Sequence, residues 1–373
     1  MTFRRYKHLR APILVLAALS LAGAGRAQAE AQLLIEADTG KVLHAENAAY
    51  PWYPASLTKL MTAYVTLRAV KERRLRLNSL LTVTRNAAAQ QPVKMGFKIG
   101  TTITVDNALK MLMVRSANDV AVTIAEGVGG SIEGFADLMN AHARRLGMTQ
   151  TSYVNPNGLP AESQISSARD QAILARAMLV EFPQYRSYWN ISAIRYGKRV
   201  MRNYNSLLFR YPGANGMKTG FICASGFNLV ASATRNGRSL IAVVLGSYSS
   251  ATRAQKAAQL FERGFNGDRL NWLRPSLGAV DALVPIAADP PNLREEMCGG
   301  HRRKPPSEEN DEEEVTTASN GKPGEPQVFL FSSLNPPPNK FVLGPAVVTD
   351  EPVVVFTGPP SGEAKPKVSA AKR

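Results

Sequence analysis

The dipeptide Asn236-Gly237, which lies between two runs of mainly apolar residues, most constrains how this chain can fold. Asn-Gly favours the type I′ turn, whose twist suits a pair of antiparallel strands. The dipeptide therefore predicts a hairpin of strands over residues 226–235 and 238–246, and residues 216–222 form a candidate third strand just before it. Such a sheet has apolar faces, so other parts of the chain must cover them.

A second pair of short strands is expected near the start of the chain, where residues 31–37 and 42–45 flank the turn sequence Asp38-Thr39-Gly40. Further short strands are expected over residues 80–84 and 101–105. Helices are expected over residues 56–71, 106–114 with Asp106 as the N-cap, 120–126, 131–146, 167–179 and 252–264. We therefore expect an α+β fold in which one antiparallel sheet, assembled from both ends of the domain, is flanked by helices and carries a helical subdomain.

The two ends of the chain differ in composition from its middle. A basic start, the apolar run 11–24 and the sequence Ala27-Gln28-Ala29 predict a secretory signal peptide over residues 1–29, cleaved near Ala29. A membrane anchor is the alternative, but the run is shorter than the roughly 20 residues that a span needs. Residues 289–373 hold 14 of the 24 prolines, so we expect a Pro-rich, largely disordered tail after a folded domain over residues 30–288.

Charge and cysteine content narrow the partners and the compartment. The whole chain has a net charge of +16, and residues 30–288 alone carry +14, which favours a polyanionic partner. An exported protein rarely meets nucleic acid, so we expect a periplasmic or cell-wall-associated protein with weak affinity for an anionic wall or membrane surface. Cys223 and Cys298 are the only cysteines. We expect them to be free or incidentally paired, although a single bridge is possible in an oxidising compartment.

Ser56 and Lys59 form the first candidate catalytic pair. They lie three residues apart at an expected helix start, and this spacing places two side chains on one face of a helix. A lysine can remove the proton of a serine hydroxyl only if desolvation or a second cation lowers its pKa. Ser-x-x-Lys alone is common and more often marks a solvated helix turn, so the pair needs support from elsewhere.

A polar sequence, Arg115-Ser116-Ala117-Asn118-Asp119, interrupts two helical segments. Serine, asparagine and aspartate compete with helical hydrogen bonds and favour caps and turns. A corner between two helices can hold Ser116 and Asn118 toward one point. The simpler alternative is that one of them caps the second helix.

The sequence Lys218-Thr219-Gly220 lies on the expected strand just before the hairpin. On a strand, Lys218 and Gly220 share one face, and a glycine lets the backbone of a ligand approach closely, as an added strand would. Lys218 could also be the second cation that Lys59 requires.

The three motifs together are far more specific than any one of them. Ser-x-x-Lys, then Ser-x-Asn and then Lys-Thr-Gly occur in this order in penicillin-binding proteins and class A β-lactamases. Residues 36–43, 54–56, 155–159, 166–170 and 226–233 add to the likeness. Over residues 31–266 the chain resembles the low-molecular-mass penicillin-binding proteins of the serine-type D-alanyl-D-alanine carboxypeptidase family, peptidase family S11.

This resemblance implies a β-lactamase/transpeptidase-like fold and removal of the terminal D-alanine from peptidoglycan stem pentapeptides. Ser56 would be the acylated nucleophile, Lys59 the base, and Ser116 the relay that passes a proton to the leaving amine. The residues that would bind the substrate are Asn118, Lys218, Thr219, Gly220, Phe221 and Arg253. The backbone N–H groups of Ser56 and Phe221 would form an oxyanion hole. β-Lactam antibiotics would act as covalent inhibitors, and we expect neither a cofactor nor a metal.

The sequence also departs from the family pattern and leaves alternatives open. Asn157 stands where many relatives carry a histidine, so the role of that side chain does not transfer. The β-rich second domain and the C-terminal membrane helix that are common in relatives are not evident, which leaves membrane attachment in doubt. The alternatives are a D,D-endopeptidase of peptidoglycan cross-links, a class A-like β-lactamase with only Glu162 as a candidate deacylating residue, and a non-catalytic wall-binding protein. A histidine-based or metal-dependent hydrolase lacks its motifs.

Overall fold

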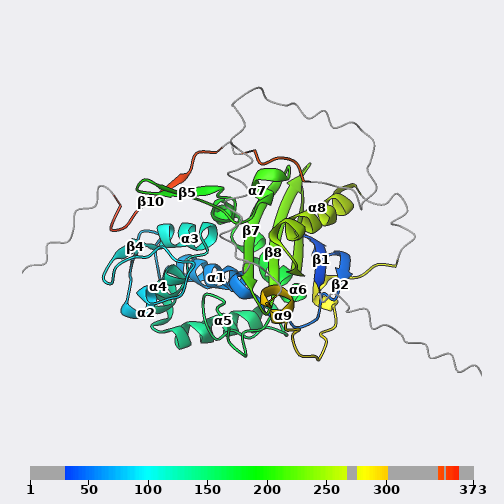
Figure 1. Cartoon of the computed structure of the whole chain (residues 1–373), viewed down its shortest axis with the longest axis horizontal. Coiled ribbons are helices and arrows are strands. Elements are labelled where there is room, and N and C mark those ends of the chain that lie inside the picture. The colour runs from blue at the N-terminus through cyan, green and yellow to red at the C-terminus, as the bar shows by residue number, and fades with distance from the viewer. Residues whose placement is uncertain (1–29, 267–274, 301–342, 348–349, 361–373) are drawn as a thin grey trace, which may run out of the picture.

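A computed structural model describes residues 30–266, 275–300, 343–347 and 350–360. Its centre is a five-stranded antiparallel sheet in the order β2-β1-β9-β8-β7 (Figure 1). The strands are β1 Ala31–Glu36, β2 Val42–Glu46, β7 Ala214–Ile222, β8 Gly226–Arg235 and β9 Arg238–Ser247. β1 pairs with β9, so both ends of the domain meet in one sheet, as expected. The expected signal peptide lies outside the described residues.

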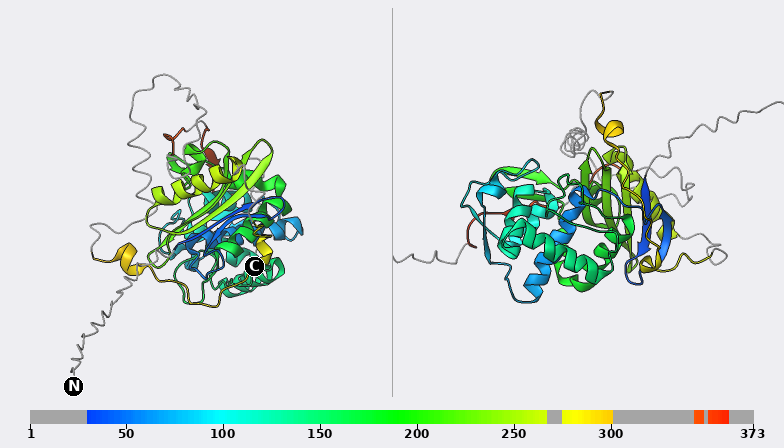
Figure 2. Two further views of the ribbon diagram at one scale, coloured as in Figure 1. Left: turned by 90° about the vertical axis from the view of Figure 1, so that its right-hand side faces the viewer. Right: turned by 90° about the horizontal axis from the view of Figure 1, so that it is seen from below.

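Helices cover both faces of the sheet, because successive strand residues point to opposite sides (Figure 2). Helix α8 (Ser250–Asn266) packs on one face, where Leu34 of β1 and Phe261 of α8 belong to the same buried cluster. Helix α6 (Ala168–Glu181) packs on the other face, in a larger cluster that includes Leu33 and Ile35. Leu33 and Ile35 therefore point into the core on one face of the sheet, and Leu34 points into the core on the other face.

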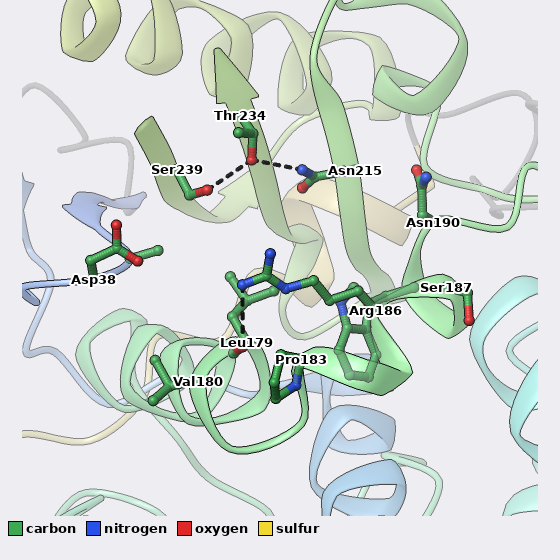
Figure 3. A pocket seen from close by; sticks show the side chains of 12 residues that line it. Asp38, Leu179, Val180, Pro183, Arg186, Ser187, Asn190, Asn215, Thr234 and Ser239 are labelled. Atoms are coloured by element: carbon green, nitrogen blue, oxygen red, sulfur yellow. Dashed lines mark hydrogen bonds between the residues drawn. The ribbon is translucent and has the colours of Figure 1, made fainter. Parts of the chain in front are cut away.

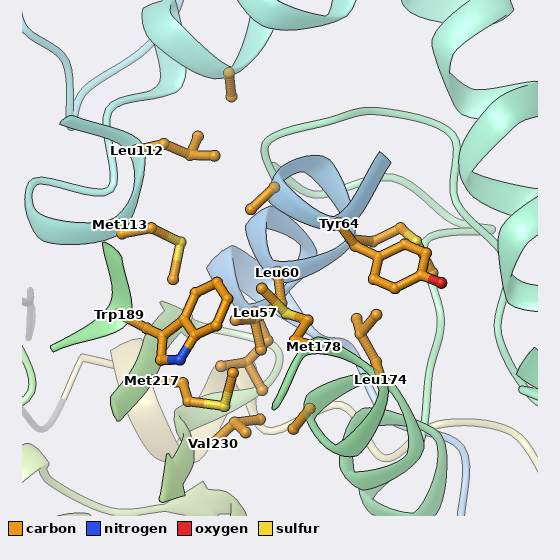
Figure 4. Packing of buried hydrophobic residues seen from close by; sticks show 14 of the residues in the cluster. Leu57, Leu60, Tyr64, Leu112, Met113, Leu174, Met178, Trp189, Met217 and Val230 are labelled. Atoms are coloured by element: carbon orange, nitrogen blue, oxygen red, sulfur yellow. The ribbon is translucent and has the colours of Figure 1, made fainter. Parts of the chain in front are cut away.

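Helix α1 (Thr58–Lys71), which follows a short 3-10 turn η1 (Ala55–Leu57), runs through the larger core. Its side chains and that of Leu57 pack between helix α6 and the sheet (Figure 4). The labelled residues of this packing are Leu57, Leu60, Tyr64, Leu112, Met113, Leu174, Met178, Trp189, Met217 and Val230. Most of α1 is buried, which makes it a rigid support for anything at its N-terminus.

The helical part of the molecule is built around α1. It consists of β3 Leu80–Thr82, α2 Arg85–Ala88, β4 Thr102–Thr104, α3 Val105–Val114, α4 Asn118–Gly129 and α5 Ile132–Leu146. The expectation that Asp106 caps α3 is wrong. The hydroxyl of Thr104 accepts the bond from Asn107 N instead, and Asp106 lies in the first turn, where it pairs with Lys110.

The segment between α6 and β7 gave no clear signal in the sequence and forms several short elements. They are η2 Pro183–Trp189, β5 Ala193–Tyr196, β6 Arg199–Arg202 and α7 Leu207–Arg210. β5 and β6 form a small hairpin apart from the main sheet.

The C-terminal region contains structure that was not expected. A 3-10 turn η4 (Val280–Ala282), a short helix α9 (Arg294–Cys298) and a strand β10 (Val353–Val355) occur there, and β10 pairs in parallel with β5. Leu293, Met297 and Val355 are buried, so the few apolar residues of this Pro-rich region pack onto the domain. The expectation of disorder over residues 289–373 is wrong for α9 and β10. The remaining tail residues, 301–342, 348–349 and 361–373, lie outside the described residues.

Cys223 and Cys298 form a disulfide bond, with Cα atoms 5.7 Å apart. The expectation of free thiols is therefore wrong, and the single bridge that the sequence left open is formed. The turn after β7 carries one cysteine and α9 carries the other, and these two segments also share a backbone hydrogen bond, from Leu293 N to Ala224 O. Among the described residues, no helix has both the length and the apolar character needed to cross a bilayer.

The turn that leads into α1 is held by a close contact between two backbones. Ala55 has a φ of 48°, a left-handed conformation that is uncommon for a residue with a side chain. Gly158, whose φ is 81°, lies against it so closely that a Cβ atom at position 158 would be 1.8 Å from Ala55 O. The 155–160 loop therefore fixes the start of α1 only because position 158 has no side chain.

We expect Gly158→Ala to destabilise the protein much more than Gly147→Ala. Gly147 also has a positive φ, of 75°, but nothing lies within 4 Å of where its Cβ would be. Both variants place a Cβ atom in a left-handed backbone conformation, which costs about 1–2 kcal/mol. Only Gly158→Ala adds the clash, so its loss in the free energy of unfolding should exceed about 3 kcal/mol in urea titrations. Equal losses in the two variants would contradict this account.

Candidate active site

Ser56 and Lys59 are in contact, as their spacing predicted. Lys59 Nζ lies 2.9 Å from Ser56 Oγ, and the lysine side chain is completely buried. Lys59 Nζ also donates hydrogen bonds to Asn118 Oδ1 at 2.8 Å and to the backbone oxygen of Asn157 at 2.6 Å. The amine therefore joins the start of α1, the start of α4 and the 155–160 loop. Burial disfavours the charged form of a lysine.

The polar corner between α3 and α4 brings the side chain of Asn118 to this amine. The N-cap of α4 is Ala117, and no side chain caps the helix, so neither Ser116 nor Asn118 serves merely as a cap. Asn118 accepts from Lys59 with Oδ1 and donates from Nδ2 to Gln91 O at 3.0 Å. Its side chain is thus fixed from both ends.

Ser116 has two unusual properties. Its φ of 59° lies in the left-handed region, which costs energy for a residue with a side chain. Its hydroxyl oxygen is buried and has no hydrogen-bond partner among the described residues. A buried hydroxyl without a partner costs about 1–3 kcal/mol, and such strained or unsatisfied groups concentrate at functional sites.

Strand β7 carries the third motif and is the edge strand of the described sheet. This edge lies against the start of α1, where Ser56 is. A Cβ atom on Gly220 would lie 2.8 Å from the backbone nitrogen of Ser56, so the two backbones touch at a position that only glycine allows. Lys218 and Thr219 precede it on the same strand and are both buried, and Lys218 Nζ donates to Thr219 O at 3.0 Å. Phe221, whose N–H was expected at the oxyanion hole, follows directly.

Arg253 reaches β8, the strand next to β7, from α8. Its side chain is buried, and Nη1 donates to Asn228 O at 3.1 Å. The guanidinium lies 5.5 Å from the ring centroid of Phe227, which packs on Phe221 with centroids 4.4 Å apart. Arg253 is therefore bound to β8, the neighbour of the strand that bears Lys218.

Three supporting residues were not found from the sequence. Asn228 donates from Nδ2 to Tyr53 O at 2.9 Å, and its Oδ1 accepts from Gly246 N at 3.0 Å, so it ties the turn before Ser56 to β8 and β9. Its only sequence signal is a polar residue within an apolar strand. Gln91 acts through its backbone oxygen, which no sequence pattern indicates. The contribution of Asn157 is also a backbone oxygen, and its side chain turns away to Gln90 Oε1 at 2.9 Å.

Buried bonds hold the loop that carries Asn157. Thr62 of α1 donates to Pro156 O at 2.6 Å, and Gln164 Nε2 donates to Thr58 Oγ1 at 2.9 Å. Further along, Asp170 accepts bonds from Gln150 N and Thr151 Oγ1, while burial raises the pKa of its carboxyl group. The loop is therefore tied to α1, and the residues just before it are tied to α6.

The cavity in Figure 3 is separate from this site. Its volume is about 480 Å³, and it lies between η2, the end of α6 and the sheet. Its lining includes Asp38, Arg186, Asn190, Asn215 and Thr234, but none of the predicted site residues. Within the described ranges, no three His, Cys, Asp or Glu side chains gather as a metal site would require.

Comparison with known proteins supports one family throughout. The family model for D-alanyl-D-alanine carboxypeptidases, peptidase family S11, matches residues 19–249. The chain is 36% identical to the D-alanyl-D-alanine carboxypeptidase DacC of Escherichia coli K12 over 244 residues, which are 64% of this chain and 61% of that protein. It is 33% identical to DacF of Bacillus subtilis over 245 residues, 64% of this chain and 62% of that protein. The chain thus matches less than two thirds of the length of these relatives.

Solved structures agree with this comparison. The D-alanyl-D-alanine carboxypeptidase DacD of Francisella tularensis superposes with a TM-score of 0.62 at 30% identity, covering 63% of this chain and 70% of that one. Penicillin-binding protein D2 of Listeria monocytogenes, solved in its ampicillin-bound form, gives 0.58 at 28% identity, covering 63% of this chain and 96% of that one. The fold is that of the penicillin-binding proteins, and the chain belongs to the D-alanyl-D-alanine carboxypeptidase family, peptidase family S11.

Proposed function

We propose that this protein is an exported serine carboxypeptidase that removes the terminal D-alanine from peptidoglycan stem pentapeptides through an acyl-enzyme on Ser56. The observation that carries the proposal is the buried amine of Lys59, which contacts Ser56 Oγ, Asn118 Oδ1 and Asn157 O at once. The signal-like residues 1–29 and the +14 charge of residues 30–288 support work at an anionic cell wall. The proposed folded domain begins at residue 30.

In the first step, the neutral amine of Lys59 takes the proton of Ser56. A neutral amine has two hydrogens and one lone pair. If the hydrogens are directed at Asn118 Oδ1 and Asn157 O, the lone pair faces the hydroxyl of Ser56. Oγ then attacks the carbonyl carbon between the two D-alanines. The negative oxygen that forms is stabilised by the N–H groups of Ser56 and Phe221, an arrangement worth a few kcal/mol.

In the second step, the C–N bond breaks and free D-alanine leaves. Its nitrogen needs a proton, which Lys59 returns through the hydroxyl of Ser116. The missing partner of Ser116 Oγ among the described residues supports this relay, because a substrate amine would supply that partner. Water then attacks the ester on Ser56, with Lys59 again as the base.

The proposed substrate site lies between β7 and the α3–α4 corner. Lys218, Thr219 and Arg253 bind the terminal carboxylate, and Asn118 holds the amide of the acyl part. The backbone of the substrate adds to the edge of β7, where the absence of a side chain at Gly220 leaves room. A β-lactam carries a carboxylate and an acylating carbonyl at similar positions, so it would acylate Ser56 as well. The exposed Glu162 offers no buried carboxylate for rapid deacylation.

We expect Ser56→Ala to abolish both the acylation by penicillin and the release of D-alanine. Mass spectrometry after treatment with penicillin should show the wild-type protein heavier by one antibiotic molecule for hours, and the variant unchanged. Release of D-alanine from a stem pentapeptide should fall at least about 1,000-fold, because the nucleophile is gone. An adduct on the variant, or no adduct and no release with the wild type, would reject the proposal. Rapid loss of the adduct would favour a β-lactamase.

A matched pair of asparagine variants separates side-chain from backbone contributions. Asn118→Ala removes an acceptor for Lys59, so the acylation rate with a fluorescent penicillin should fall about 10- to 100-fold. Asn157→Ala keeps the backbone oxygen that binds Lys59, so the rate should fall no more than about fivefold. Similar losses in the two variants would contradict the assigned geometry.

A further inference from the structure

Helix α9 sits on the turn that leads away from the reaction centre. Residues 223–225 form the turn between β7 and β8, and α9 is attached to this turn at several points. Cys298 is bonded to Cys223, and Leu293 N donates to Ala224 O at 3.0 Å. The methyl carbon of Met297 lies 3.0 Å from where a Cβ of Gly226 would be. Figure 1 shows α9 at the end of β7 and β8.

The direction of β7 determines which part of a substrate would reach this turn. In the proposed function, the terminal carboxylate lies by Lys218 and Thr219, and the reacting carbonyl lies by the N–H of Phe221. A substrate chain therefore advances along β7 from residue 218 toward residue 221. Extended residues rise about 3.3 Å each in both chains. The residues that precede the reacting D-alanine must then pass Ile222 and Cys223 and arrive beside α9.

We propose that α9, fastened by the Cys223–Cys298 bond, forms an outer wall of the proposed substrate site and contacts the stem-peptide residues that precede the reacting D-alanine. This inference rests on the proposed function. The exposed side of α9 carries Arg294, Glu295 and Glu296, while Leu293 and Met297 are buried against the domain. The charges of both signs on α9 can pair with a stem peptide, because the residues that precede its terminal D-alanines carry amino and carboxylate groups. α9 therefore adds affinity for long substrates.

The disulfide bond is what makes such a wall possible. α9 has only five residues, and isolated helices shorter than about 12 residues are marginal in water. Its buried contacts involve only a few side chains of a Pro-rich region. Without the bond, α9 has little to keep it on the turn, although Trp52 Nε1 still holds the turn by donating to Ser225 O at 3.0 Å. Loss of the bond should therefore free α9 more than the turn.

The test compares a long and a short substrate in the full mature chain. In the double variant Cys223→Ser/Cys298→Ser, kcat/KM for a stem pentapeptide should fall about fivefold, mainly through KM, as loss of an exposed charged contact would cause. The value for N-acetyl-D-alanyl-D-alanine, which is too short to reach α9, should not change. Met297→Ala, which keeps the bond but loosens α9, should also lower the ratio of kcat/KM for the pentapeptide to kcat/KM for the short substrate. Val354→Ser, an exposed change in β10, should leave the ratio unchanged.

The outcomes separate this inference from the proposed function. An unchanged ratio of the two kcat/KM values in the double variant and in Met297→Ala would overturn the role of α9. An equal loss on both substrates would do so as well, because it would show a general structural effect. A wild-type protein that turned over neither substrate and formed no penicillin adduct would instead reject the proposed function, and the role of α9 with it.

Discussion

Backbone contact between β7 and the start of α1 is the constraint on which the site depends. A side chain at position 220 would meet the nitrogen of Ser56 at 2.8 Å, so the sheet edge and the helix can approach only through glycine. The φ of Gly220 is not positive, and the glycine is therefore needed for space and not for a turn. This contact holds the strand with Lys218 against the helix with Lys59, although the two residues are far apart in the sequence.

Strain and burial accompany this arrangement. Ala55, which precedes the first motif, and Ser116, the serine of the second, both have left-handed backbone angles that cost energy for residues with side chains. Each is held by its surroundings: Gly158 packs on Ala55, and the corner with Ser116 is fixed through the bonds of Asn118. The energy for this local strain comes from the large core around α1. A buried amine, a buried hydroxyl and two strained residues at one place are typical of a catalytic centre and not of a structural crossing.

Much of the fold could be predicted because its strands and main helices are marked by local sequence patterns. The Asn236-Gly237 turn and the mainly apolar runs beside it predicted β8 and β9, residues 216–222 were the candidate for β7, and apolar spacing predicted the main helices. The contact of Ser56 with Lys59 followed from helical spacing alone. The polar segment at Ser116 and Asn118 was predicted as a corner, but the contact of Asn118 with Lys59 depends on tertiary packing.

Other features could not be predicted, for identifiable reasons. The oxygen that Asn157 supplies belongs to the backbone, so no residue type marks it. Thr104 and Asp106 are both good helix caps, and only the geometry of β4 decides between them. The composition of the C-terminal region predicts disorder, yet a few apolar side chains and one disulfide bond are enough to hold α9. Two cysteines alone could not show that they pair, because their distance in space was unknown.

The parallel pairing of β10 with β5 means that the domain is not complete at residue 288. Val353–Val355 fill one side of β5, and Leu343 packs against the cluster beneath α8. A protein shortened to residues 30–288 would expose the backbone groups of β5 as an open edge and uncover apolar surface near Phe209, whose oxygen accepts from Val347 N. Such an edge pairs readily with another chain. In the full chain, β10 covers this edge of β5 and is itself the outer strand of the described sheet, so the C-terminal residues extend the sheet and complete the packing around Phe209.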